Sequence, residues 1–213
     1  MANRKPTVLV TGFGPFGPHK VNSSMQAVKV CQALAASDIT KYVNLVTEEI
    51  PVIYEYVEKN IPNLWKKHRP QLCIHAGVNG LSKTVLLEKC AHNDGYQRMC
   101  DVDQKFHKTN HCIPGAPNVM HTDVDLEAIC AKARQVGSPC EICLSDDAGR
   151  YLCDFTYYTS LYHGDSPTVF IHLPPMEGPY TVQEMEETLR ILILTILDEL
   201  RNCKHSRKSN RKL

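Results

Sequence analysis

The chain alternates short apolar, β-branched runs with segments of helical periodicity along most of its length. Val8-Leu9-Val10 is the first such run, and residues 72–76 and 168–173 are later ones. Runs of this length between helical segments are typical of strands buried on both faces of a parallel sheet. The order therefore predicts an α/β domain with a largely parallel sheet and helices on both faces.

The expected elements can be placed along the chain. We expect strands at 7–10, 42–48, 72–76, 84–90, 141–145 and 168–173, and helices at 24–36, 53–68, 122–136, 147–162 and 181–202. Pro62 predicts an interruption in the second helix, and Thr122 is the expected cap of the third. Thr181 and Glu184 form a capping-box pattern before the last helix. Residues 92–121 are polar and aperiodic, which is typical of a functional loop or of a disordered one.

Length and charge exclude several classes of protein. We expect one domain over residues 1–203 and a basic, disordered tail over 204–213, within a chain of 213 residues. The 24 Lys and Arg almost balance the 23 Asp and Glu. The net charge therefore gives no electrostatic attraction to nucleic acid or to an anionic membrane. No apolar run is long enough for a signal peptide or a membrane span. The expectation is a soluble, cytoplasmic protein whose oligomeric state is open, a monomer included.

A glycine-rich loop, Gly12-Phe13-Gly14-Pro15-Phe16-Gly17, follows the first expected strand. Its spacing fits a dinucleotide-binding fingerprint, but Pro15 lies inside it and the next helix begins too late to meet a phosphate. Phe13 and Phe16 fit better as walls for a small flat ligand. A plain turn that buries both rings is the alternative.

The ten cysteines and ten histidines allow two kinds of site. In a cytoplasmic chain most of the thiols are expected to be reduced and buried. Two clusters invite a zinc or redox interpretation: Cys100, His107, His111 and Cys112, and the pair Cys140 and Cys143. Their irregular spacing argues against a tetrahedral zinc site, so no metal or cofactor is expected.

Three residues have the types of a nucleophilic triad. Cys153 lies near the start of a predicted helix, where the helix dipole favours the reactive thiolate. His172 and Glu88 each end an apolar run. An acid that orients a histidine, which in turn activates a cysteine, is the arrangement of acyl-transfer enzymes. A buried thiol, a satisfied histidine and a solvated glutamate are the alternative interpretation of the same residues.

The stretches around these residues resemble the pyroglutamyl-peptidase I family of cysteine peptidases. The resemblance spans about residues 7–200 and rests on Thr11–Gly17, Val21–Ser24, Leu87–Cys90 with His92-Asn93, Asp147–Tyr162 (DAGRYLCDFTYYTSLY) and His172–Pro175. It implies a three-layer α/β/α sandwich with a mostly parallel, mixed central sheet. It also implies hydrolysis of the N-terminal pyroglutamyl residue of peptides, with no metal or cofactor.

The resemblance also implies roles for individual residues. Cys153 would be the nucleophile, His172 the general base and acid, and Glu88 the group that orients His172. Phe13 and Phe16 would be aromatic walls for the pyroglutamyl ring, and Asn22 is a further expected substrate-binding residue. The amides at the start of the helix that carries Cys153 are the expected oxyanion donors.

Two departures from the bacterial pattern leave a second function open. The stretch Gly77–Leu81 lacks the arginine that bacterial members carry there, and Asp154 stands where they often have asparagine. Residues 92–121 match the family least and could be a lid over the substrate or an oligomer contact. The alternative function is a catalytically impaired homologue that binds pyroglutamyl peptide N-termini.

Overall fold

The computed structural model describes residues 5–14 and 23–209. Its main sheet has six strands in the order β2-β1-β3-β8-β4-β7, and a separate antiparallel pair is formed by β5 and β6. The strands are β1 (Thr7–Phe13), β2 (Asn44–Ile50), β3 (Leu72–Val78), β4 (Val85–Glu88), β5 (Cys90–His92), β6 (Val119–His121), β7 (Ile142–Ser145) and β8 (Thr168–Leu173). The helices are α1 (Ser23–Ala36), the 3-10 helix η1 (Asp38–Lys41), α2 (Tyr54–His68), α3 (Leu126–Gln135), α4 (Leu152–His163) and α5 (Val182–Ser209).

The main sheet is mixed, and its change of direction lies beside β8. The strands β2, β1, β3 and β8 are parallel to one another, whereas β4 pairs with β8 in antiparallel register and with β7 in parallel. The predicted mostly parallel, mixed sheet is therefore confirmed. The strand β8 occupies the interior of the sheet, which agrees with its mostly apolar, fully buried sequence.

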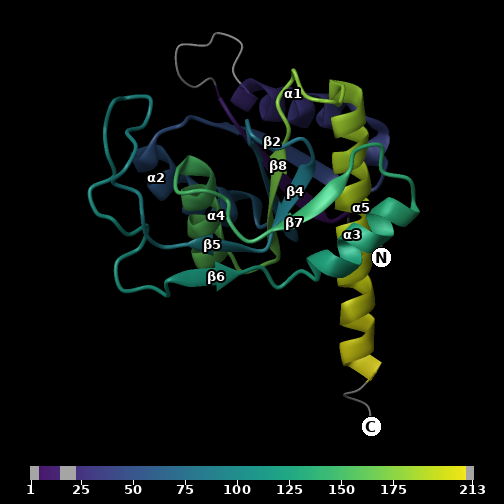
Figure 1. Cartoon of the computed structure of the whole chain (residues 1–213). Helices are drawn as coiled ribbons and strands as arrows, with labels where there is room; N and C mark the ends of the chain where they lie inside the picture. The colour runs from purple at the N-terminus through teal and green to yellow at the C-terminus, as the bar shows by residue number, and fades with distance from the viewer. Residues whose placement is uncertain (1–4, 15–22, 210–213) are drawn as a thin grey trace.

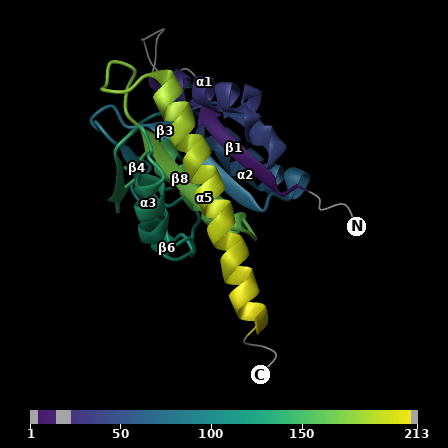
Figure 2. The ribbon, with the colours of Figure 1, turned by 90° about the vertical axis from the view of Figure 1, so that its right-hand side faces the viewer.

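Helices cover both faces of the sheet, as Figures 1 and 2 show, which confirms the three-layer sandwich. One face packs against α1, α3 and α5 through a core that includes Val10, Ile74 and Ile171. The opposite face packs against α2 and α4 through Leu9, Cys73 and Phe170. Strand residues alternate between the two cores because successive side chains point to opposite faces. No helix in the described part of the chain is long and apolar enough to cross a membrane.

Several expected boundaries are wrong, each for a physical reason. Helix α2 continues through Pro62 without interruption, because Val57, Ile61 and Trp65 bury a continuous stripe along it. The carbonyl of Glu58, which loses its partner to the proline, belongs to an exposed residue. The expected strand over 84–90 is instead two strands in different sheets, β4 and β5.

Two helix ends also differ from expectation. The cap of α3 is Asp125, whose side chain accepts a hydrogen bond from the Ala128 amide, rather than Thr122. Helix α5 begins with the predicted box, in which the Thr181 amide donates to Glu184 and the Glu184 amide to Thr181. It extends to Ser209 rather than to Asn202, because no glycine or proline follows and basic residues suit a helix C-terminus. Its far end projects beyond the other elements (Figure 2).

Candidate active site

Cys153 occupies the first turn of α4 and lies on the sheet over Gly77 of β3. A Cβ atom added at Gly77 would lie 2.9 Å from the Cys153 sulfur. The side chain of Cys153 is partly accessible, whereas Leu152 before it and Asp154 after it are buried. The helix therefore presents one reachable thiol to the sheet face near the carboxyl end of β3.

His172 and Glu88 come from neighbouring strands on the same sheet face. Glu88 of β4 lies opposite Phe170 of β8 in antiparallel register, so His172 is its diagonal neighbour. The His172 Nδ1 and Glu88 Oε1 atoms are 2.7 Å apart, and both side chains are buried. The other carboxylate oxygen of Glu88 is buried without a hydrogen-bond partner among the described residues, so the imidazole is the carboxylate's main partner.

The Cys153 thiol lies close enough to His172 to affect the pKa of the imidazole. Because Nδ1 of His172 is taken by Glu88, Nε2 is the nitrogen left for the thiol. Burial alone would lower the pKa of His172, but its interactions with Cys153 and Glu88 raise that pKa to about 9. At neutral pH the imidazolium form of His172 is therefore favoured.

The amides at the start of α4 supply hydrogen-bond donors beside the thiol. The first N–H groups of any helix have no partner inside the helix. The Tyr151 side chain gives no cap hydrogen bond to this turn. These donors and the positive end of the helix dipole can hold an oxyanion formed on a carbonyl that Cys153 attacks.

The tyrosine of α4 nearest to Glu88 fixes the helix against the sheet. The Tyr157 hydroxyl donates a 3.0 Å hydrogen bond to the Glu88 carbonyl, and its ring packs against Phe170 with centroids 5.7 Å apart. The helix that holds the nucleophile and the strand that holds the acid are thereby joined directly.

Phe13 lies in the same row of side chains as Gly77 and His172. Thr11 of β1 pairs with His75 of β3, and Gly77 pairs with His172 of β8. Two residues further along β1, Phe13 therefore reaches the level of Gly77 on the same face. Its ring is buried in the α2 and α4 core. The other expected substrate-binding residues, Phe16 and Asn22, lie outside the described residues.

The position of the site on the sheet differs from expectation in one respect. If β7 and β8 were parallel, as the sequence predicts for most of the sheet, Cys153 and His172 would lie at one carboxyl edge. Because β4 and β7 run antiparallel to β8, the segment after β7 starts at mid-sheet, where Ser145 is level with Glu88 and Phe170. Cys153 therefore contacts the face of the sheet, which explains why a glycine is needed beneath it.

Beneath the site, a line of hydrogen bonds crosses the core that α2 and α4 share. His75 Nδ1 lies 2.7 Å from the Thr11 hydroxyl, and its Nε2 lies 3.4 Å from the Cys73 sulfur. Burial lowers the pKa of His75 to about 3 and raises that of Cys73 to about 12. Both side chains are therefore neutral at physiological pH, and His75 links β3 to Thr11 of β1.

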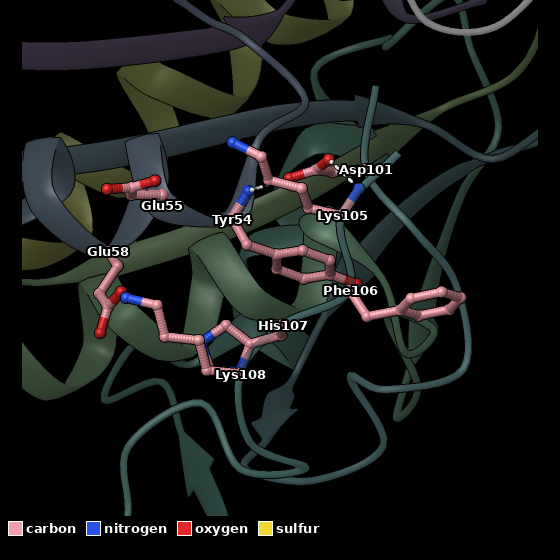
Figure 3. Close-up of a pocket in the computed structure, with 8 residues that line it drawn as sticks. All are labelled: Tyr54, Glu55, Glu58, Asp101, Lys105, Phe106, His107 and Lys108. Carbon is pink, nitrogen blue, oxygen red and sulfur yellow. Dashed lines mark hydrogen bonds between the residues drawn. The ribbon is translucent and has the colours of Figure 1, made fainter. Parts of the chain in front are cut away.

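The loop between β5 and β6 packs over the start of α2 and bounds a cavity of about 340 Å³ (Figure 3). The Asp101 carboxylate accepts a hydrogen bond from the Tyr54 amide, which caps α2 from a distant part of the chain. The Tyr54 ring contacts those of Tyr151 and Phe155, at centroid distances of 6.0 and 5.1 Å. The loop itself also packs on the helix that carries Cys153, because the Tyr96 and His107 rings lie 5.0 and 4.8 Å from that of Phe155.

The cysteines and histidines that were considered as zinc ligands do not come together in the described structure. No group of three or more potential metal-binding side chains comes together among the residues that the structure describes. His107 Nδ1 lies 2.8 Å from the Thr109 carbonyl, and the Cys112 sulfur lies 3.3 Å from the Thr159 hydroxyl. These contacts are with ordinary core and loop groups.

Sequence reasoning missed Gly77 and the surroundings of Asp154. The only sequence signal for Gly77 is a glycine at the end of an apolar strand, which also fits a plain turn. The Asp154 carboxylate accepts hydrogen bonds from the His92 amide and the Tyr96 hydroxyl, and nothing in the local pattern announces these partners.

Comparisons with known proteins agree with this geometry. A family model described as pyroglutamyl peptidase matches residues 6–191. The chain is 42% identical over 205 residues to pyroglutamyl-peptidase 1 of Homo sapiens, covering 94% of each chain. It is 27% identical over 211 residues to pyrrolidone-carboxylate peptidase of Pyrococcus furiosus, covering 91% of this chain and 99% of that protein.

Solved structures share the fold. A mutant pyrrolidone carboxyl peptidase from P. furiosus superposes with a TM-score of 0.80 at 24% identity, over 91% of this chain and 99% of that one. Pyroglutamyl peptidase I from Bacillus amyloliquefaciens gives a TM-score of 0.79 at 22% identity, over 90% and 95%. With the family model matched over most of its length and a cysteine, a histidine and a glutamate joined on one sheet face, the chain belongs to the pyroglutamyl peptidase family.

Proposed function

We propose that this protein is a cysteine-type omega-peptidase that removes an N-terminal pyroglutamyl residue from peptides. The observation that carries the proposal is the hydrogen bond between Glu88 and His172, with the Cys153 thiol close enough to the same imidazole to raise its pKa, in a chain of this family. A thiol in line with an oriented imidazole is the arrangement of nucleophilic acyl transfer.

In the acylation step, His172 holds the proton of the Cys153 thiol while the sulfur attacks the scissile carbonyl carbon. The carbonyl oxygen becomes an oxyanion that accepts hydrogen bonds from the first-turn amides of α4. His172 then gives its proton to the leaving amine nitrogen, the C–N bond breaks, and a thioester remains on Cys153. Glu88 keeps Nδ1 of the ring occupied, which holds Nε2 toward the reacting atoms.

In the deacylation step, His172 takes a proton from a water molecule as that water attacks the thioester carbonyl. The tetrahedral intermediate collapses, the C–S bond breaks, and pyroglutamate leaves with a new carboxyl group. The returned proton restores the Cys153–His172 pair. Every proton in the cycle moves through groups of this chain, so the reaction needs no cofactor.

The chemistry of the pyroglutamyl ring favours a binding pocket with aromatic walls. Pyroglutamate is a neutral lactam without a free amino group, so it needs apolar walls and a few polar partners instead of a carboxylate. We propose Phe13 as one wall, because it lies in the row beside Gly77 and His172. We assign Phe16 as the second wall and Asn22 as a polar partner on the family resemblance.

The thiol chemistry also bears on where the protein works. The cysteines that the structure describes are free, and a catalytic thiolate needs a reducing environment. We therefore place the protein in the cytoplasm, with residues 1–203 as a single peptidase domain that acts on pyroglutamyl peptides.

The test is hydrolysis of a fluorogenic pyroglutamyl amide, with reductant and chelator present, by wild type, Cys153→Ser and Cys143→Ser. The matched control removes another partly exposed thiol, remote from Gly77. We expect turnover by wild type and Cys143→Ser and none by Cys153→Ser. Binding of a pyroglutamyl peptide without turnover by folded wild type would establish the impaired homologue instead.

A further inference from the structure

Asp154, the residue after the nucleophile, is a carboxylate buried away from the reacting atoms. Its exposed fraction is 0%, and it lies in the first turn of α4, where a negative charge suits the helix dipole. The mechanism assigns it no role. A buried charge is costly unless it is paired and hydrogen-bonded, so its partners indicate what it does.

Those partners belong to the start of the loop between β5 and β6. The His92 amide donates to both carboxylate oxygens of Asp154, at 3.2 and 3.3 Å. The Tyr96 hydroxyl lies 2.9 Å from Oδ2. One side chain on the catalytic helix therefore holds two points of the segment 92–96.

Arg150 fixes the same segment from the other side. Its guanidinium lies 3.7 Å from Asp154 Oδ2 and also bonds to Asp147. Its aliphatic stem covers Gly95, where an added Cβ would lie 3.1 Å from two carbons of that stem. Gly95 has φ +100°, a conformation that suits glycine. Arg150 and Asp154 together therefore clamp the segment 92–96 onto the start of α4.

Several titratable groups, on different segments packed against Asp154, face its carboxylate. The titratable groups that face it are Asp147, Arg150, His92, Tyr96, Cys90 and Cys112. Burial and Arg150 lower the pKa of His92, partly offset by Asp147 and Asp94, while His121 lowers it further. His92 is thus neutral near pH 7, and its Nδ1 is buried without a hydrogen-bond partner among the described residues.

We propose that Asp154 is a positioning residue for Cys153: its ionised carboxylate, with Arg150, locks the segment 92–96 against the first turn of α4 and so holds the thiol in line with His172. The proposal rests on the proposed function. Protonation of Asp154 removes the charge that faces Arg150 and loosens the clamp. Activity then falls on acidification through a group that never touches substrate.

The pH range in which Asp154 titrates follows from the surroundings of its carboxylate. Burial raises the pKa of Asp154 to about 7, against the lowering effects of Tyr96, His92 and Arg150. The folded protein thus binds a proton at Asp154 between about pH 4 and 7 that the unfolded chain releases. By linkage, this group makes the free energy of unfolding fall as pH rises through that range.

The experiment compares wild type with Asp154→Asn, which keeps the shape and one acceptor oxygen but cannot ionise. The ratio of wild-type to variant kcat is expected to be about 10 to 100 at pH 8 and to approach 1 below about pH 6, with KM changed less than about 3-fold. The variant's Tm at pH 8 is expected not to fall. The control Asp125→Asn changes another helix-terminal aspartate, the cap of α3 on the opposite sheet face, and should match wild type.

A second variant keeps the proposal testable if Asp154→Asn does not fold. Arg150→Met removes the cation that favours ionised Asp154, so its kcat should begin to fall at a higher pH than in wild type. Equal kcat for wild type and Asp154→Asn at pH 8 would overturn the proposal. So would a pH-independent loss of kcat accompanied by a lower Tm, because that result is structural.

The rate of Cys153 alkylation by iodoacetamide separates this proposal from the proposed function. The same pH-dependent difference between wild type and Asp154→Asn is expected in that rate, which needs no substrate. Wild type that shows the difference without cleaving pyroglutamyl amides would disprove the proposed function alone. An identical alkylation profile in both proteins would disprove the positioning role alone.

Discussion

Gly77 and Cys153 are in such close contact that β3 leaves no room for a side chain beneath the nucleophile. A Cβ at Gly77 would lie 2.9 Å from the Cys153 sulfur and 2.9 Å from the Phe170 ring. Real Cβ atoms essentially never approach other atoms so closely. The position of the thiol is therefore set by the sheet as well as by α4.

Gly77→Ala is expected to displace the thiol while the fold persists. Overpacking of this kind costs about 1–3 kcal/mol of stability, and a displaced nucleophile lowers kcat by about 100-fold. Urea unfolding and kcat on a pyroglutamyl amide would measure the two effects. Gly80→Ala is the matched control, because nothing lies within 4 Å of a Cβ there. Undiminished kcat in Gly77→Ala would show that the sulfur is not fixed by β3.

Glu88→Gln keeps the size of the acid and removes its charge. The His172 ring then loses the charged group that, together with Cys153, raises its pKa to about 9, so its pKa falls and less imidazolium is present at neutral pH. The amide can also hold the ring in the wrong tautomer. We expect kcat to fall by about 10²- to 10⁴-fold, with KM nearly unchanged. A variant with wild-type kcat would exclude Glu88 as the orienting acid.

The pair of His172 and Glu88 also makes the free energy of unfolding depend on pH. The folded pKa of His172, about 9, lies above its ordinary 6.5. Its contribution to the free energy of unfolding is therefore fully present below about pH 6.5 and is lost as pH rises through 9. Urea unfolding of wild type and Glu88→Gln at pH 6 and pH 9.5 would measure it. The two proteins should converge at the higher pH, and a constant difference between them would contradict the linkage.

Iodoacetamide should inactivate the enzyme in step with alkylation of Cys153. Burial raises the pKa of Cys73 and of Cys112 to about 12, so these thiols react slowly. Mass spectrometry during inactivation would compare Cys153 with Cys100 and Cys143, which are also partly exposed. Activity that disappears while Cys153 stays unmodified would exclude it as the nucleophile.

Removal of the distant cap of α2 should destabilise the protein. Asp101→Ala leaves the Tyr54 amide without its acceptor, and loss of an N-cap costs about 0.5–2 kcal/mol. The expected result is a lower urea midpoint and faster proteolysis within residues 99–108. Asp103→Ala, an exposed aspartate of the same loop, should change neither; equal effects of the two substitutions would contradict the capping role.

The sequence predicts the structural features that depend on neighbouring residues. It does not predict those that depend on contacts between distant parts of the chain. The strand 168–173 and the capping box at Thr181 follow from neighbouring residues. The antiparallel direction of β4 and the Asp101 cap depend on segments far apart in the chain, so no local signal encodes them. Asp154 is likewise defined by His92 and Tyr96, more than 50 residues away.

The candidate site was predictable in its residue types but not in its geometry. A cysteine at a helix start and two polar residues that end apolar strands mark Cys153, His172 and Glu88. Their meeting depends on a two-residue diagonal in the β4 and β8 register. Gly77 has no side chain to reveal its role, and Phe16 and Asn22 lie outside the described residues.

The central place of β8 has a consequence for the newly made chain. It leaves the ribosome after every other strand that the structure describes, yet it inserts between β3 and β4, which are made much earlier. Until it docks, Glu88 has no histidine and Cys153 has no base. Cys153 can therefore act as a nucleophile only after β8 has joined the sheet. Refolding measured by activity should thus lag behind refolding measured by helix content.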